Sequence, residues 1–295
     1  MMVKIRKFRQ EDLTELVNII NDSYKDSYEF IPYTEDSLLK EIMERKLNVL
    51  VAEEKGEIKG LISYWHGGWG EEIDSLCVKE CENQSQIEDM LLQEVEKFVS
   101  GEKLFIALGA EKIDYEKWAK RGYKPEGGLY HMTAELKELK PIPPIPKEIV
   151  LRSLKIGEEK KLVEVVNTAY GGERLTLNSI QKWKERDPIF NEDWIHVADY
   201  KGEIVSVVVS RRDIKYNSYF RAKRGYLGPA ATLPEYRGKG LASALTQKAM
   251  NFLLEKGMNC VGLYTSERNK ASVNLLKKLG FKVAYRWKFL TKHFK

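Results

Sequence analysis

LPEYRGKGLASAL, residues 233–245, is the most informative stretch of this sequence, because residue type and spacing together predict one kind of site. A proline closes a strand-like segment, the basic loop Arg237-Gly238-Lys239-Gly240 follows, and small and apolar residues then begin a helix. Glycines at the start of a helix let backbone N–H groups approach an anion, and the helix N-terminus adds positive potential. The pattern predicts a phosphate-binding turn. From these four residues alone, a solvated basic turn is the alternative.

The flanking residues favour the phosphate-binding turn. Residues 225–232, GYLGPAAT, predict a bulged strand whose backbone is open on one side, because glycines and Pro229 interrupt an apolar run. Apolar residues recur at helical spacing from Leu241 to Phe252, and Gly257 ends that pattern. Strand, glycine-containing basic loop and helix follow in the order that such a turn needs.

This segment resembles the coenzyme A motif of the GNAT superfamily of N-acetyltransferases, Arg/Gln-x-x-Gly-x-Gly/Ala, which reads RGKGLA at residues 237–242. A second frame, residues 235–240, also accommodates two glycines but begins with an acidic residue. Residues 269–281, NKASVNLLKKLGF, are similar to a second GNAT signature. Two positions depart from that signature: Leu276 stands where a general-acid tyrosine is common, and Ser272 stands at the small alanine position.

Length, composition and charge limit the class of protein and the kinds of ligand that we expect. The chain has 295 residues, of which 43% are hydrophobic, so it can build one large or two ordinary domains. It has no apolar run of about 18 residues and no signal-like start, so we expect a cytoplasmic protein without a membrane partner. Its 3 cysteines cannot form a disulfide framework, and Cys77 and Cys81 lack the further ligands of a zinc site, so no metal is expected. A net charge of +5 indicates a mild preference for anionic ligands and does not favour nucleic acid.

Apolar periodicity predicts an alternation of strands and helices in the first half of the chain. The predicted strands are residues 3–8, 48–53, 58–65, 73–78, 104–108 and 128–136, and the predicted helices are residues 11–24, 35–46, 86–98 and 115–120. The segment KPIPPIPK, residues 140–147, then predicts an extended linker, because proline fixes φ and lacks an N–H donor. A binding site for proline-recognising domains is the alternative for this segment.

The order of elements repeats after the linker. Lys-Gly-Glu-Ile at residues 55–58 recurs 146 positions later at residues 201–204, whereas KRGY at residues 120–123 is answered 158 positions later by KLGF. The second copy therefore carries about twelve extra residues. We predict an α/β protein (α+β, mixed sheet) of two tandem GNAT-like domains, residues 1–139 and 148–295, each a mostly antiparallel mixed sheet flanked by helices.

The first copy lacks the phosphate-binding loop. The corresponding residues 79–86, KECENQSQ, contain no glycine and carry two acids, so a phosphate there would meet side chains and negative charge. This copy is expected to lack a coenzyme site. Three roles are open to it: it could shape the substrate cleft, stabilise the pair of domains, or bind no ligand.

The resemblance implies that acetyl-CoA lies between the fourth and fifth strands of the second copy. Its pantetheine would pair with main-chain groups near Ala231 and Leu233, and its pyrophosphate would lie on the amides of residues 237–241. The cofactor-binding residues implied are Ala231, Thr232, Leu233, Arg237, Gly238, Lys239, Gly240, Leu241, Ala242, Asn269 and Ser272. The implied function is direct transfer of an acetyl group to a primary amine of a small molecule or peptide. A non-catalytic acyl-CoA sensor or scaffold is the alternative, and the protein would be a monomer or a homodimer.

The proton-transfer residues are harder to assign. Glu173 is the candidate base, with a surface carboxylate as its alternative, and Tyr264 and Ser272 are candidates to protonate the thiolate in place of Leu276. Asn269 also fits as a helix N-cap, and His196 fits either the cleft or the core.

Residues 211–224, RRDIKYNSYFRAKR, have six basic residues, and the extra residues of the second copy fall around them. They predict a solvated hairpin, or a surface for an acidic substrate, the coenzyme's 3′-phosphate or nucleic acid.

Overall fold

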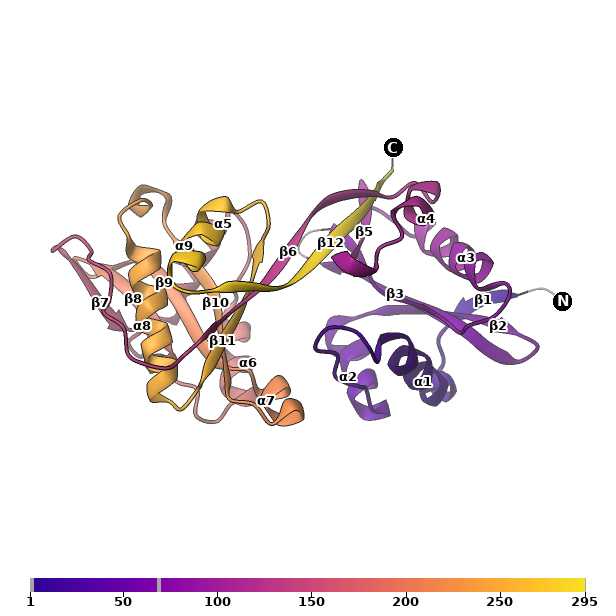
Figure 1. Cartoon of the computed structure of the whole chain (residues 1–295), viewed down its shortest axis with the longest axis horizontal. Helices are drawn as coiled ribbons and strands as arrows, with labels where there is room; N and C mark the ends of the chain where they lie inside the picture. The colour runs from indigo at the N-terminus through magenta and orange to yellow at the C-terminus, as the bar shows by residue number, and fades with distance from the viewer. Residues whose placement is uncertain (1–2, 68–69, 295) are drawn as a thin grey trace. The chain divides into compact units, whose positions relative to one another are not determined.

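The structure is a computed structural model that describes residues 3–67 and 70–294 (Figure 1). It divides into two compact units: an N-terminal unit, Met1–Gly128 with Arg286–Lys295, and a C-terminal unit, Leu129–Tyr285. Each unit is a mixed sheet with helices packed on it, which confirms the predicted fold class.

The N-terminal unit orders its strands β1-β2-β3-β4-β5-β12, and only the β4–β5 pair is parallel. Its strands are β1 Lys4–Lys7, β2 Asn48–Glu54, β3 Glu57–Gly67, β4 Gly70–Val78, β5 Lys103–Gly109 and the beginning of β6 Lys124–Glu135. Its helices are α1 Leu13–Tyr24, α2 Glu35–Arg45, α3 Gln84–Glu96 and α4 Tyr115–Lys120, with short 3₁₀ turns at Gln10–Asp12 and Ala110–Lys112.

The C-terminal unit orders its strands β6-β11-β10-β9-β8-β7, and only β10–β11 is parallel. Its strands are β7 Ile149–Ser153, β8 Ile195–Tyr200, β9 Glu203–Arg212, β10 Arg224–Thr232, β11 Cys260–Ser266 and the beginning of β12 Lys282–His293. Its helices are α5 Glu159–Tyr170, α6 Leu177–Arg186, α7 Ile214–Phe220, α8 Leu241–Glu255 and α9 Lys270–Lys278, with 3₁₀ turns at Glu192–Trp194 and Pro234–Tyr236.

The C-terminal core forms because β9 is covered on both faces. Successive residues of β9 from Ile204 to Ser210 are all buried, and both α5 and α8 pack on this strand. A strand buried on both faces shows a continuous apolar run instead of alternation. The run EIVSVVVS thus fixes β9 at the centre of the sheet, next to the strand that leads into the glycine loop.

The two units exchange their last strands. Residues 129–135 of β6 belong to the C-terminal unit, where they pair with β11, and residues 286–293 of β12 belong to the N-terminal unit, where they pair with β5. The division of the chain therefore differs from the expected 1–139 and 148–295, because β6 and β12 are each long enough to serve two sheets. β6 begins at Lys124, four residues before the strand expected at residues 128–136.

The linker and the inserted residues also take definite places. Residues 140–147 form no helix or strand and belong to the C-terminal unit, where the main chain of Lys140 exchanges two hydrogen bonds with Asn251 of α8. The insertion separates β9 from β10 and contains α7, whereas only residues 68–69 separate β3 from β4. Within the described part of the chain, no helix is long and apolar enough to cross a membrane.

Duplication is visible in one repeated ion-pair cluster. Arg6 on β1 donates to Asp12 at 2.7 and 2.8 Å and to Glu53 at 2.6 Å. Arg152 on β7, 146 positions later, donates to Glu158 at 2.7 and 2.9 Å and to Asp199 at 2.9 Å. Each cluster joins the first strand, the start of the first helix and the end of the second strand. The constant offset confirms two copies of one unit.

This cluster predicts acid sensitivity. Hydrogen bonds from Arg152 lower the pKa of Glu158 below its ordinary 4.5, so its stabilisation is complete above that pH and is lost as the pH falls through the lowered value. Arg152→Met is expected to lower the free energy of unfolding by about 2 kcal/mol at pH 7 and to flatten its decline below pH about 4.5. Urea unfolding measured from pH 7 to 3 tests this, with the exposed Lys160→Met as control. An unchanged pH profile would contradict it.

Candidate functional site

Strands β10 and β11 separate part-way along their length. They pair in parallel only from Arg224 to Tyr226, opposite residues 260–262. Beyond this point β10 bulges, with its register against β9 shifting between Leu227 and Ala230, while β11 continues to pair with β6 as far as Ser266. The predicted bulged strand is confirmed, and the opening leaves one edge of β10 without a strand partner among the described residues.

The main-chain groups at this open edge differ from the expected set by one position. Leu233 donates its N–H to Val205, and Ala231 accepts from the hydroxyl of Ser206, so both residues point toward β9. Because main-chain groups alternate in direction along a strand, Ala230 and Thr232 point into the opening. The bulge at Gly228 and Pro229, which shifts the register by one residue, accounts for the difference.

The glycine loop has the geometry of an anion site. Gly238 and Gly240 have φ of +75° and +79°, and Gly240 is the N-cap of α8, which has no side-chain cap. The first N–H groups of this helix are therefore left for solvent or a ligand. A Cβ on Gly238 would meet nothing within 4 Å, whereas one on Gly240 would lie 3.3 Å from the carbonyl oxygen of Pro144, so the space is open at Gly238.

The side chains around this loop mostly hold it in place. Arg237 donates to the carbonyl oxygens of Thr232 at 3.2 Å and Ala169 at 3.0 Å, so it ties the loop to the end of α5. The Lys239 ammonium lies 4.7 Å from the ring centre of Tyr236. Leu241 is buried in the core and Ala242 is partly exposed.

The candidate proton-transfer residues have different surroundings. Glu173 lies in the exposed loop between α5 and α6 and makes no hydrogen bond or ion pair within the described part of the chain. Asn269 accepts the N–H of Ser272, which confirms it as the N-cap of α9. The Ser272 hydroxyl accepts a hydrogen bond from Thr265 at 3.3 Å. Leu276 is 4% exposed in the core, so its position offers no acid.

Tyr264 is the candidate that the sheet places at the opening. It lies on β11 two residues past the last pair with β10 and is 44% exposed. Its ring stacks on His131 of β6 at 4.6 Å between centroids and lies 6.5 Å from Tyr226 of β10. Sequence reasoning missed His131 and Tyr226, because they stand outside the motifs and only the strand pairing brings them to Tyr264.

Comparison with known proteins identifies the unit that carries this site. Residues 161–281 match the model of the acetyltransferase (GNAT) family. Residues 161–281 therefore carry a GNAT acetyltransferase domain. A mycothiol acetyltransferase of Arthrobacter sp. (strain FB24) is 29% identical over 173 residues, which cover 55% of this chain and 52% of that protein. N-alpha-acetyltransferase 30 of Schizosaccharomyces pombe is 29% identical over 85 residues, covering 29% of this chain and 55% of that protein.

The fold agrees with the tandem arrangement. The solved structure of a tandem GNAT protein from the clavulanic acid biosynthesis pathway matches with a TM-score of 0.68 at 13% identity, covering 99% of this chain and 98% of that one. This identity establishes likeness of fold alone. The chain spans about half the length of the curated mycothiol acetyltransferases that it matches.

The histidine and the basic segment of this GNAT unit are mostly structural. His196 is 1% exposed, its Nε2 lies 3.0 Å from the Ser210 hydroxyl, and burial lowers its pKa to about 3, so it is a neutral core residue. In the basic segment, residues 211–224, Arg212 pairs with Asp187 and Arg224 pairs with Asp213. The segment is therefore a helical insertion with partly neutralised charge, and the expectation of a simple solvated hairpin is incomplete.

The N-terminal unit has a similar opening between two strands, but no glycine loop follows it. β4 and β5 pair only from Glu71 to Ile73, and a register shift on β4 places Asp74 at a bulge. After β4, the side chain of Lys79 pairs with Glu15 on α1.

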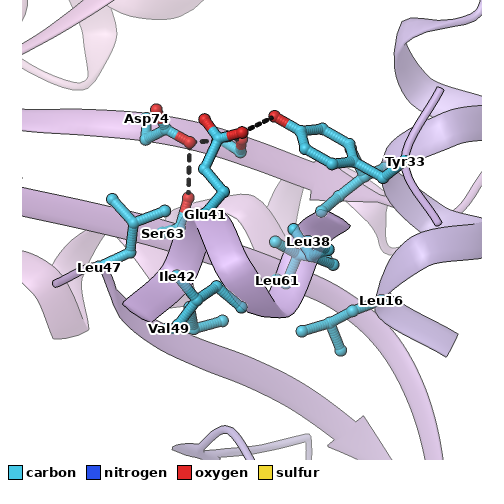
Figure 2. A pocket seen from close by; sticks show the side chains of 12 residues that line it. Leu16, Tyr33, Leu38, Glu41, Ile42, Leu47, Val49, Leu61, Ser63 and Asp74 are labelled. Carbon is cyan, nitrogen blue, oxygen red and sulfur yellow. Dashed lines mark hydrogen bonds between the residues drawn. The ribbon is translucent and has the colours of Figure 1, made fainter. Parts of the chain in front are cut away.

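A small pocket lies beside this bulge, walled by apolar residues of α1, α2, β2 and β3 (Figure 2). At its polar end Tyr33 donates to Glu41 at 3.1 Å, and Ser63 donates to Asp74 at 3.3 Å (Figure 2). Arg45 bonds both carboxylates, at 3.0 Å to Glu41 and 2.5 Å to Asp74. Both carboxylates of the pocket are therefore already paired with the guanidinium of Arg45. Among the described residues no group of three or more His, Cys, Asp or Glu side chains could hold a metal.

Proposed function

We propose that the C-terminal unit binds acetyl-CoA and transfers its acetyl group directly to a primary amine. The observation that carries the proposal is the open edge of β10 leading straight into the uncapped N-terminus of α8. An extended amide chain such as pantetheine pairs with free main-chain groups at a strand edge, and a pyrophosphate is stabilised by helix N–H groups. Both needs are met within residues 230–242.

The residues between β10 and the start of α8 fit acetyl-CoA as the acetyl donor. Thr232 and Ala230 supply the main-chain groups that face the opening, in place of Ala231 and Leu233. In this structure their carbonyl oxygens accept from Arg237 and from the Tyr170 hydroxyl at 3.2 Å, and these side-chain bonds must yield to a bound pantetheine. The amides of residues 238–242 would hold the pyrophosphate, and the positive φ of Gly238 and Gly240 keeps side chains away from it.

Two proton transfers complete the reaction. The amine must lose a proton before its nitrogen attacks the thioester carbonyl, and the leaving sulfur must gain one. We assign the second transfer to the Tyr264 hydroxyl, because Tyr264 stands beside the opening whereas Leu276 is buried and Ser272 is engaged with Thr265. For the first, Glu173 has the right location in the loop between α5 and α6, and water can carry the proton to it.

A non-catalytic acyl-CoA sensor is the second candidate. The buried Leu276 favours it, since that position lacks the hydroxyl that the mechanism expects. The two proposals share coenzyme binding and differ in turnover. Release of free thiol from acetyl-CoA in the presence of an amine panel separates them.

Gly238→Glu tests the coenzyme site. The new carboxylate places negative charge in front of the helix N-terminus, so acetyl-CoA affinity is expected to fall about 30-fold. Gly257→Glu is the matched control, because Gly257 also has positive φ and open space and lies past the opposite end of α8. Calorimetric titration of acetyl-CoA is the measurement. Equal binding by both variants, or no binding by the wild type, would contradict the proposal.

We further propose that the N-terminal unit binds no coenzyme, so the titration should give one site per chain. A glycine-free turn follows β4, and the small pocket beside its bulge is walled mainly by apolar side chains and carries the carboxylates of Glu41 and Asp74, which would repel a phosphate. Two sites per chain would overturn this part of the proposal.

A further inference from the structure

Arg211 is a partly buried cation with few polar partners. It is the second-to-last residue of β9, and its guanidinium lies between two rings, 4.8 Å from Trp183 of α6 and 5.2 Å from Tyr226 of β10. Its single hydrogen bond runs from Nη2 to the carbonyl oxygen of Gly228 at 3.2 Å. Its Nε is buried and has no partner, and no carboxylate in the described part of the chain forms an ion pair with it.

The neighbouring arginines show that this arrangement is unusual within the segment. Arg212 pairs with Asp187 and Arg224 pairs with Asp213, whereas Arg211 has only aromatic faces and one carbonyl. Burying a charge is costly unless it is paired. Burial lowers the pKa of Arg211, Tyr226 and Asp213 oppose that lowering, and Arg186 adds to it. A planar guanidinium with free N–H donors is the group best suited to a carboxylate or a phosphate.

Charges of both signs act on Tyr226, with two arginines against one aspartate, Asp213. Burial raises the pKa of Tyr226, and Arg211 and Arg174 both oppose that rise, which places two cations near one phenol. Arg174 stacks over Tyr170 at 5.6 Å and has no ion pair within the described residues. An anion entering here would gain from several arginines at once.

The location connects Arg211 to the transfer reaction. Arg211 pairs in register with Tyr226, which is the last residue of β10 that pairs with β11. The carbonyl that it bonds belongs to Gly228, inside the bulge where the two strands separate. Arg211 therefore lies at the apex of the opening, on the same stretch of β10 as Tyr226, whose ring neighbours Tyr264.

We propose that Arg211 binds an anionic group of the acceptor, so that the acceptor is an amine that also carries a carboxylate or a phosphate. This inference rests on the proposed acetyl transfer. The anion would complete the hydrogen bonding of the guanidinium between Trp183 and Tyr226, and the amine of the same molecule would reach the opening. Arg211 is a binding residue in this proposal and takes no part in proton transfer.

Matched amines test the proposal. The pairs are β-alanine with β-alaninamide for a carboxylate, and phosphoethanolamine with ethanolamine for a phosphate. Thiol release from acetyl-CoA, corrected for the fraction of unprotonated amine, is expected to give the anionic member of at least one pair a kcat/KM about 10- to 100-fold higher. Which pair shows the preference separates the carboxylate from the phosphate.

Two variants test whether the preference for the anionic amine depends on Arg211. Arg211→Gln keeps a donor for Gly228 and removes the charge, so it should abolish the preference, mainly through KM, and leave the neutral amines and acetyl-CoA affinity unchanged. Arg221→Gln removes the same charge from an exposed position of the same segment and should leave the preference intact. Equal rates for both members of each pair, or an equal loss for both members in Arg211→Gln, would overturn the proposal and leave acetyl transfer standing.

A binding measurement covers the case in which no amine is acetylated. β-Alanine and phosphoethanolamine are titrated calorimetrically into the protein saturated with coenzyme A. Binding that disappears in Arg211→Gln would support the anion site while the proposed catalysis fails. Absence of such binding would overturn the anion site as well.

Discussion

Residues 148–295 produced alone are expected to be unfolded or aggregated, although they contain every motif of the GNAT unit. Without residues 129–135, β11 loses the partner that it pairs with at seven positions, and its other side is already open beyond Gly262. The core also loses Met132, which is fully buried, and Ala134. Burial of Met132 alone contributes about 2 kcal/mol, against a total stability of about 5–15 kcal/mol for an ordinary domain.

The matched fragment is residues 129–285, the C-terminal unit as the structure divides it. This fragment keeps β6 beside β11 and is expected to fold cooperatively and to bind acetyl-CoA. Circular dichroism, gel filtration and thermal unfolding of the two fragments make the comparison. If residues 148–295 unfold with the same midpoint as residues 129–285, the exchanged strand does not support the fold and our interpretation fails.

Tyr264→Phe is expected to lower kcat about 100-fold and to leave acetyl-CoA affinity unchanged. The change removes one hydroxyl and keeps the ring that stacks on His131, so packing is preserved. Loss of a positioned general acid typically costs about 10²–10⁴ in rate. Steady-state thiol release gives kcat, and calorimetry gives the affinity.

Tyr115→Phe is the control for this substitution, because Tyr115 has the same 44% exposure and lies on α4 of the N-terminal unit. An unchanged kcat in Tyr264→Phe would remove Tyr264 from the mechanism. In that event Ser272 is the next residue to test, because its hydroxyl only accepts from Thr265, the neighbour of Tyr264 on β11, and can still donate a proton.

The local sequence pattern was sufficient to predict the helices and strands and the duplication. Helix α4 was predicted at residues 115–120 and is found there, because an aspartate cap and a short apolar face define it within a few residues. The offset of 146 residues located the copies, and the Arg6 and Arg152 clusters confirm it in three dimensions. The sequence also located the glycine loop, since positive φ and an uncapped helix start are properties of adjacent residues.

The exchange of β6 and β12 between the two units could not be predicted from the sequence, and the reason is physical. β5 and β11 occupy corresponding places in similar sheets, and nothing in the alternation of β6 says which of the two it pairs with. The direction of main-chain groups at Ala230 and Thr232 was missed because it depends on a register shift. His131 and Tyr226 were missed because they lie on two different strands and become neighbours of Tyr264 only through pairing, and Arg211 was noted only as one of the basic residues of 211–224.

The exchanged strands have a consequence for the history of the gene. A duplicated copy that has no glycine loop could ordinarily be lost from the gene by truncation without harm to the other copy. Here the coding sequence of the first copy is joined to residues 129–135, which pair with β11 in the second unit, and the chain's last strand pairs with β5 in the first unit. Truncation of one copy would therefore also remove a strand from the sheet of the other, which favours keeping both copies in the gene.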